Sequence, residues 1–248
     1  MTAHKQYLYG LHTVESFLKH QADNALILFV SKDRHDEKIN RIIDLAKSAR
    51  ISIESVASAK LNQLSQEGVH QGVVLQAKVQ EYQESDLPAL LTELTSVPFI
   101  LVLDSIQDPH NLGACLRTAE AAGVNLVMIP KDRSATLTPL VRKISTGAAE
   151  LMPIVQVTNL RRAINIAQQQ GIWFVGLTAS PKAKSIYQIK LTGPLALVLG
   201  SEGKGLRVLT EQQCDSLAYI PMQGDIESLN VSVATGVGLF EALRQRHF

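Results

Sequence analysis

The segment Leu195–Leu206 reads LALVLGSEGKGL, an apolar run that passes directly into three glycines and a glutamate. An apolar run without polar alternation is typical of a parallel strand that is covered on both faces. Ligands of open α/β sheets bind beyond the carboxyl ends of the strands, so this strand end is a candidate binding site. A tight turn with glycines at positive φ also explains the segment, and both interpretations stay open at this point.

The order of these glycines does not match the common nucleotide motifs. A dinucleotide-binding fingerprint has the order GxGxxG after the first strand, whereas this segment has GxxGxG after a late strand. A phosphate-binding P-loop requires serine or threonine after its lysine, and here Gly205 follows Lys204. A nicotinamide-dependent oxidoreductase is therefore not indicated.

The composition predicts a globular protein of one large or two modest domains. The chain has 248 residues, of which 46% are hydrophobic. Its two cysteines lack metal-site spacing and cannot form a disulfide framework, so we expect a reducing compartment. The first residues, MTAHKQYLYG, do not resemble a signal peptide, and no apolar run approaches the ~20 residues of a membrane span. We expect a cytoplasmic location.

The net charge of +1 hides a strongly basic block. Between Lys131 and Arg207 there are eleven Lys or Arg residues against three acidic residues. Clustered basic charge is typical of a protein that binds a polyanion, although solvated helix faces would also explain it.

Helical and strand patterns alternate in both halves of the chain. We expect a small α/β domain over residues 1–78, a linker over 79–97 and a second α/β domain over 98–248. In the second domain, the apolar runs FILVLDS, NLVMIP, IWFVGLT, LALVLGS and LAYIPM are expected to form parallel strands. The last helix is expected to carry one apolar stripe, formed by Val233, Val237, Phe240 and Leu243.

Two further segments carry candidate functional residues. In the first, Asp108 is expected to cap a helix that starts at Pro109, with Asn111 in its first turn and Arg117 farther along. An arginine among small and apolar residues requires a partner unless its side chain reaches solvent. In the second segment, Ser228 and Asn230 precede the last helix, which Ser232 is expected to cap; they are either turn residues or site residues.

Together, NLGACLRTA, LVLGSEGKGL and IPM…SLNVSVA resemble the three signature motifs of the SpoU (TrmH) family of RNA ribose 2′-O-methyltransferases. The N-terminal part is similar to the L30e-like substrate-binding domain of some members. The resemblance implies an α/β fold with a C-terminal trefoil knot of the SPOUT type, and a homodimer whose sites are completed across the interface. It also implies S-adenosylmethionine as cofactor, with cofactor-binding residues Thr178, Gly200, Ile220 and Leu229.

The same resemblance implies the reaction and its residues. It implies 2′-O-methylation of a guanosine in 23S ribosomal RNA, in the peptidyl-transferase P-loop region, without a metal. The implied catalytic residues are Asn111, Arg117, Glu202, Ser228 and Asn230. Because arginine stays protonated in proteins, we expect Arg117 to orient the ribose and stabilise negative charge, with Glu202 holding its guanidinium. Another rRNA or tRNA nucleotide, or a non-catalytic RNA-binding dimer, are the alternatives.

Overall fold

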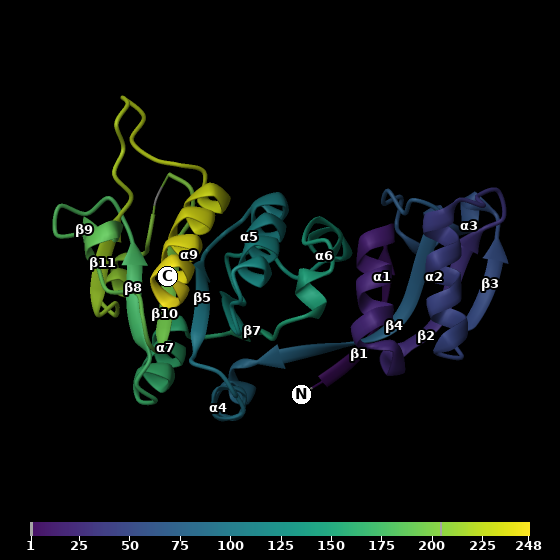
Figure 1. The fold of residues 1–248 in the computed structure, drawn as a ribbon, viewed down its shortest axis with the longest axis horizontal. Coiled ribbons are helices and arrows are strands. Elements are labelled where there is room, and N and C mark those ends of the chain that lie inside the picture. The colour runs from purple at the N-terminus through teal and green to yellow at the C-terminus, as the bar shows by residue number, and fades with distance from the viewer. Residues whose placement is uncertain (1, 204) are drawn as a thin grey trace. The chain divides into compact units, whose positions relative to one another are not determined.

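The computed structural model of the protein describes residues 2–203 and 205–248. The chain divides into two compact units, whose elements are labelled in Figure 1. The first unit contains the residues up to Glu81 together with Leu137–Leu151, and the second contains Tyr82–Thr136 and Met152–Phe248. Within the described ranges, no helix combines the length and the apolar character that crossing a lipid bilayer requires.

The first unit is a mixed sheet with helices packed against it. Its strands are β1 (Thr2–Tyr9), β2 (Ala25–Ser31), β3 (Ser52–Val56) and β4 (Val73–Gln83). Its helices are α1 (Leu11–His20), α2 (Glu37–Ser48), α3 (Ser58–Leu64) and α6 (Pro139–Ile144), with 3₁₀ turns η1 (Ala22–Asn24) and η3 (Ala148–Glu150). The strand order is β3-β2-β4-β1; β2 and β3 are parallel, and the other pairs are antiparallel. Phe17, Leu28, Ile42 and Leu75 lie in its buried core.

The segment Leu137–Leu151 packs in the first unit, although the sequence places it within the range expected for the second domain. Its Arg142 and Glu150 form a buried ion pair at 2.7 Å, and both side chains are 2% exposed. The Thr13 hydroxyl donates a hydrogen bond to the Arg142 carbonyl at 3.4 Å. The Lys143 ammonium lies 5.9 Å from the centre of the Tyr9 ring. These contacts depend on side chains far apart in the chain, and no sequence pattern indicates them.

The second unit contains the strand runs that the sequence predicts, and two more strands. Its strands are β5 (Phe99–Asp104), β6 (Leu126–Pro130), β7 (Ile154–Val157), β8 (Trp173–Leu177), β9 (Lys184–Ser185), β10 (Leu195–Gly200) and β11 (Ser216–Tyr219). Its helices are α4 (Leu87–Thr92), α5 (Pro109–Ala121), α7 (Leu160–Gln168), α8 (Val208–Glu211) and α9 (Val231–His247), with η2 (Glu84–Asp86) and η4 (Ile186–Gln188). The short β7 and β9 were not predicted.

The sheet of the second unit is parallel throughout, in the order β7-β6-β5-β10-β8-β11-β9. The strand order reverses between β5 and β10. These two strands pair with each other, and Gly200 lies opposite Asp104. Chain connections leave in opposite directions on either side of such a reversal and open a crevice beyond the strand ends. The glycine segment Leu195–Leu206 therefore ends at the position in the sheet where a ligand is expected.

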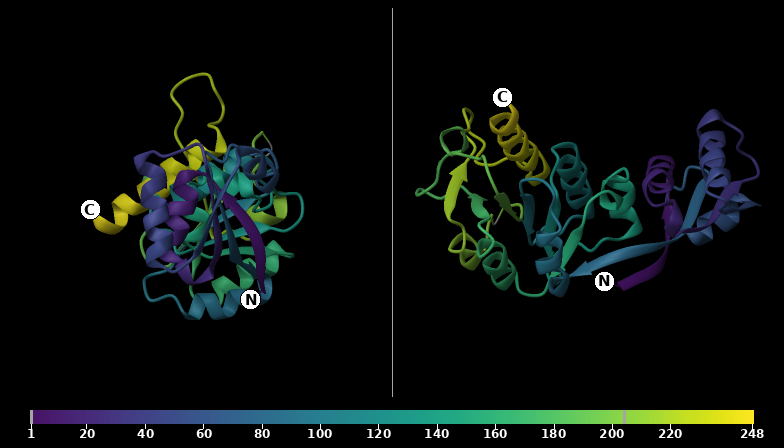
Figure 2. Two further views of the ribbon diagram at one scale, coloured as in Figure 1. Left: turned by 90° about the vertical axis from the view of Figure 1, so that its right-hand side faces the viewer. Right: turned by 60° about the horizontal axis from the view of Figure 1, so that its bottom comes forward.

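Helices cover both faces of this sheet. On one face, α4 and α7 pack on Ile100, Val102 and Val198 in the main core of the unit. On the other face, α5 packs beside α9, which also packs on β10 (Figure 2). Gly238 of α9 would place a Cβ 3.0 Å from the Leu177 side chain, so a small residue is required there.

Residues 79–97, expected to be a linker, are largely built into regular structure. Tyr82 and Gln83 of β4 pair with β7, and the leucines of α4 are buried in the core of the second unit. The Glu84 carboxylate accepts hydrogen bonds from the backbone N–H groups of Thr158 and Asn159, both at 2.9 Å, and pairs with Arg162. Burial alone would raise the pKa of Glu84, but these hydrogen bonds hold it below the ordinary value. Residues 82–97 are therefore part of the second unit, and Glu84 is held by contacts within it.

The apolar stripe predicted for the last helix lies on the opposite side from the core. Val233 is 51% exposed and Phe240 is 48% exposed. The residues of α9 buried in the unit are instead mostly small ones: Val231, Thr235, Gly238, Leu239 and Ala242. Val233 and Phe240 of the stripe therefore do not face the core, because close packing of α9 on the sheet at Gly238 requires a small side chain. These two side chains remain as an exposed apolar surface.

Candidate active site

A pocket of about 360 Å³ lies beyond the carboxyl ends of β8, β10 and β11. Its walls come from three chain segments, which lie around residues 177–179, 199–205 and 219–234. All of the residues expected to bind a cofactor line it: Thr178, Gly200, Ile220 and Leu229. Glu202 and Ser228, two of the expected catalytic residues, line the same pocket.

Close contact between backbone segments explains the glycine at the end of β10. A Cβ on Gly200 would lie 2.0 Å from the backbone carbonyl carbon and oxygen of Gly205. Real Cβ atoms do not approach other atoms so closely, so no larger residue fits without moving the backbone. Ser201 and Gly205 form an isolated antiparallel bridge, and Gly205 has a φ of +64°. The segment is therefore a tight turn, as one interpretation of the sequence proposed. It also forms a wall of the pocket, which is compatible with the other interpretation, a binding site.

A network of hydrogen bonds joins the three candidate motifs. The Glu202 carboxylate accepts hydrogen bonds from the side-chain amides of Asn111 and Asn230, each at 2.6 Å. The Asn230 amide also donates to the Asn111 side-chain oxygen at 3.1 Å. One charged group is thus held by two neutral amides whose positions are fixed by the ends of α5 and α9.

Helix capping positions both asparagines. Asp108 caps α5 as predicted, since its carboxylate accepts a hydrogen bond from the N–H of His110 at 2.8 Å. The cap of α9 is Asn230, whose side-chain oxygen accepts from the N–H of Ser232 at 2.9 Å. The prediction that Ser232 caps this helix is therefore wrong. Asn230 is both a capping residue and a member of the network, so the two interpretations offered for it do not exclude each other.

Within the described residues of a single chain, Glu202 pairs with the two asparagines rather than with Arg117, and the pairing with Arg117 stays a prediction for the homodimer. Arg117 is exposed on α5, and within the described ranges it forms no hydrogen bond or ion pair. It lies six residues after Asn111, which corresponds to about 9 Å along a helix axis and a different side of the helix. The Glu202 carboxylate is already bound by the two asparagines. Arg117 is also absent from the lining of the pocket of its own chain.

Sequence reasoning missed an ion pair that anchors the glycine segment. The Arg207 guanidinium lies 2.6 Å from the Asp104 carboxylate, which is fully buried at the end of β5. The pair ties the chain after the tight turn to the neighbouring strand. An acidic residue that ends an otherwise apolar run, FILVLD, is costly to bury unpaired, and that signal could have indicated it.

A metal site does not emerge from the described residues, among which no group of three His, Cys, Asp or Glu side chains could hold an ion. The polar side chains that line the pocket carry hydroxyls and carboxylates, and the amides of Asn111 and Asn230 hydrogen-bond one of these carboxylates, that of Glu202. Such a set can orient a neutral or cationic ligand by hydrogen bonds and charge.

Two family models match the chain, one in each half. Residues 98–240 match the SpoU rRNA Methylase family, and residues 7–83 match the RNA 2′-O ribose methyltransferase substrate binding domain. The chain is 50% identical to 23S rRNA (guanosine-2′-O-)-methyltransferase RlmB from Pseudomonas aeruginosa, over 96% of each chain. It is 49% identical to RlmB from Pectobacterium atrosepticum, over 97% of this chain and 98% of that protein.

A solved structure shares the fold. The SpoU methyltransferase AviRb from Streptomyces viridochromogenes, in complex with the cofactor AdoMet, superposes with a TM-score of 0.80 at 20% identity. The superposition covers 97% of this chain and 90% of AviRb. It confirms the expected fold class, a SPOUT-type α/β unit preceded by a smaller α/β unit. With a family model covering more than half of its residues and relatives nearly 50% identical along its length, this chain belongs to the SpoU rRNA Methylase family.

Proposed function

We propose that this protein transfers a methyl group from S-adenosylmethionine to the ribose 2′-hydroxyl of a guanosine in 23S ribosomal RNA. The observation that carries the proposal is the 49–50% identity to RlmB enzymes along almost the whole chain. The finer expectation, that the guanosine lies in the peptidyl-transferase P-loop region of the RNA and is methylated in the cytoplasm, belongs to the same proposal.

The pocket beyond β10 fits the cofactor in size and chemistry. Its volume of about 360 Å³ is within the range of ligand pockets, and apolar walls from Leu199, Ile220 and Leu229 suit an adenine ring. The hydroxyls of Thr178 and Ser228 and the carboxylate of Glu202 provide polar contacts at its edges. The glycine at position 200 lets the backbone of Gly205 approach it closely, and this close approach shapes the pocket wall. S-adenosylmethionine supplies an activated methyl group on a sulfonium, so the protein mainly has to align the acceptor.

The polar residues then orient the RNA sugar. Asn111 and Asn230, held by Glu202, are placed to hydrogen-bond the ribose or the adjacent phosphate. Ser228 contributes a hydroxyl at the pocket itself. Arg117 keeps its proton, so its role is to bind the phosphate and stabilise the negative charge that develops on the 2′-oxygen.

In a homodimer, Arg117 of one protomer can reach the pocket of the other protomer. Arg117 is exposed on α5 and does not line the pocket of its own chain, and α5 packs beside α9. The exposed Val233 and Phe240 of α9 offer an apolar surface of the kind that subunit interfaces bury. We therefore place the dimer interface on α5 and α9, where Arg117 of one protomer completes the pocket of its partner. Residues 7–83 match the RNA 2′-O ribose methyltransferase substrate binding domain, so in this proposal they bind the RNA substrate.

Calorimetric titration tests the cofactor assignment. S-adenosylmethionine is expected to bind at one site per chain, whereas NAD is expected to give no binding heat, since the glycine order does not form a dinucleotide fingerprint. Binding of NAD without binding of S-adenosylmethionine would exclude the proposed reaction.

A further inference from the structure

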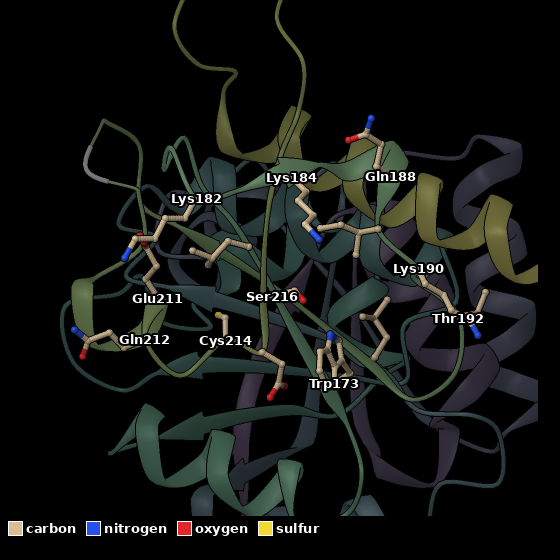
Figure 3. Close-up of a pocket in the computed structure, with 14 residues that line it drawn as sticks. Trp173, Lys182, Lys184, Gln188, Lys190, Thr192, Glu211, Gln212, Cys214 and Ser216 are labelled. Carbon is tan, nitrogen blue, oxygen red and sulfur yellow. The ribbon is translucent and has the colours of Figure 1, made fainter.

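A second and larger pocket lies apart from the candidate active site in the same unit. Its volume is about 750 Å³, and its walls come from β8, β11, the segment 182–192 and the chain after α8 (Figure 3). Among the described residues, none lines both this pocket and the one beyond β10. None of the expected catalytic or cofactor-binding residues lines this pocket, so the proposed reaction does not explain it.

Trp173, the single tryptophan of the chain, stands at the wall of this pocket. It is the first residue of β8, and it is 50% exposed although the next residue, Phe174, is fully buried. Tryptophan in a protein core buries most of its large ring, and partly exposed rings are frequent at recognition surfaces. Its position leaves an aromatic face available for stacking.

Three lysines surround the same pocket without acidic partners. Lys182, Lys184 and Lys190 are exposed and line it, and no ion pair forms with them in the part of the chain that the structure describes. Figure 3 shows the Lys184 side chain pointing toward the space above Trp173, with Lys182 and Lys190 on opposite sides of it. All three belong to the basic block that the sequence contains between Lys131 and Arg207.

The acidic residues of the pocket have other partners. The Asp215 carboxylate accepts hydrogen bonds from the N–H of Phe174 at 2.8 Å and from the Gln168 amide at 3.1 and 3.2 Å. The Glu211 carboxylate accepts a hydrogen bond from the Thr178 hydroxyl at 3.4 Å. These donors are neutral, so the pocket lining carries three lysine charges against two carboxylate charges, and among the described residues no lysine of the pocket forms an ion pair with either carboxylate.

We propose that this pocket is a second RNA-binding site, which takes a single-stranded segment of the RNA substrate by stacking a base on Trp173 and binding phosphates with Lys182, Lys184 and Lys190. An aromatic face beside unpaired cations is the combination with which proteins bind single-stranded nucleic acid. An acidic peptide would use the lysines but has no need of the exposed ring. The assignment rests on the proposed function only for the identity of the RNA, and it predicts that the enzyme contacts RNA beyond the methylated nucleotide.

The fluorescence of Trp173 reports on this pocket directly, because the chain has no other tryptophan. The full-length protein is titrated with a fluorescein-labelled twelve-nucleotide RNA of uridine and cytidine, while RNA anisotropy is recorded in parallel. Binding is expected to quench Trp173. Replacing Lys182, Lys184 and Lys190 together by glutamine is expected to weaken binding at least about tenfold and to make the slope of log K against log salt less negative by about 2.

Matched variants separate specific binding from general charge. The triple variant Lys131→Gln, Arg133→Gln and Arg161→Gln removes the same charge from exposed positions of the second unit that do not line this pocket, and it is expected to leave the quenching titration of Trp173 nearly unchanged. Trp173→Ala is expected to weaken binding about tenfold, and Trp173→Phe to restore most of it, because phenylalanine keeps a stacking face. Thermal unfolding of each variant verifies that it is folded.

Several outcomes would overturn the proposal. They are RNA binding without quenching, equal loss of quenching with the pocket triple variant and the control triple variant, or stronger quenching by polyglutamate than by RNA. Methyl transfer distinguishes this proposal from the proposed function. Unchanged kcat/KM on 23S rRNA in both the pocket triple variant and Trp173→Ala would refute the second site alone, whereas RNA binding at Trp173 without any methyl transfer would refute the function alone.

Discussion

Arg117→Ala is expected to lower methyl transfer by at least about 10²–10³-fold, the typical cost of removing a group that stabilises developing negative charge. Cofactor affinity is expected to change little, because the role proposed for Arg117 is to bind the RNA phosphate and the 2′-oxygen rather than the cofactor. Initial rates with saturating S-adenosylmethionine, together with a calorimetric Kd, measure both. Arg117→Lys is the informative control: it keeps the charge but loses the planar fork, and it is expected to recover only part of the rate. A loss of only a few-fold in Arg117→Ala would contradict the assignment.

Gly200→Ala is expected to abolish measurable cofactor binding, with a Kd at least about 100-fold higher, the upper range for inserting a methyl group into a packed site. The added Cβ would lie 2.0 Å from the backbone of Gly205, so the tight turn that forms the pocket wall must move. Gly224→Ala is a matched control on the opposite wall segment, where a Cβ meets nothing within 4 Å. Normal affinity in Gly200→Ala would show that this turn is not part of the cofactor site.

The same two variants test whether the site is shared between protomers. Mixed dimers of an Arg117→Ala chain and a Gly200→Ala chain contain one pocket with an intact glycine turn, facing an intact Arg117 of the partner. Activity is therefore expected to reappear on mixing and subunit exchange, although neither variant is active alone. If Arg117 acts within its own chain, every pocket in the mixture lacks one of the two residues and the activity stays absent.

The strands beyond Phe99 were predictable because a parallel strand covered on both faces has to be apolar throughout. β5, β6, β8, β10 and β11 all coincide with such runs. β9 is two residues long, too short for a pattern to indicate, and β7 (IVQV) contains the polar Gln156, so it is not a continuous apolar run. Capping of α5 by Asp108 was predictable for a local reason, since the capping residue and its partner are two positions apart.

Contacts between distant segments were less predictable. The pattern of α9 identified its apolar stripe, but it could not tell whether the stripe faces the core or another subunit, and Phe240 is exposed. Glu202 has three possible amide or guanidinium partners from other segments, and only the three-dimensional arrangement selects Asn111 and Asn230 over Arg117. The sequence motifs thus indicated candidate site residues, but not which of them form hydrogen bonds with one another.

Nucleoside analysis of methylated RNA tests the proposed reaction most directly. 23S rRNA is incubated with the protein and S-adenosylmethionine labelled in its methyl group, then digested to nucleosides, and the labelled product is identified and mapped. A single labelled 2′-O-methylguanosine from the peptidyl-transferase P-loop region is the expected product. Label on a base, on the ribose of another nucleoside or only in tRNA would contradict the proposed reaction, as would no transfer by a protein that binds the cofactor.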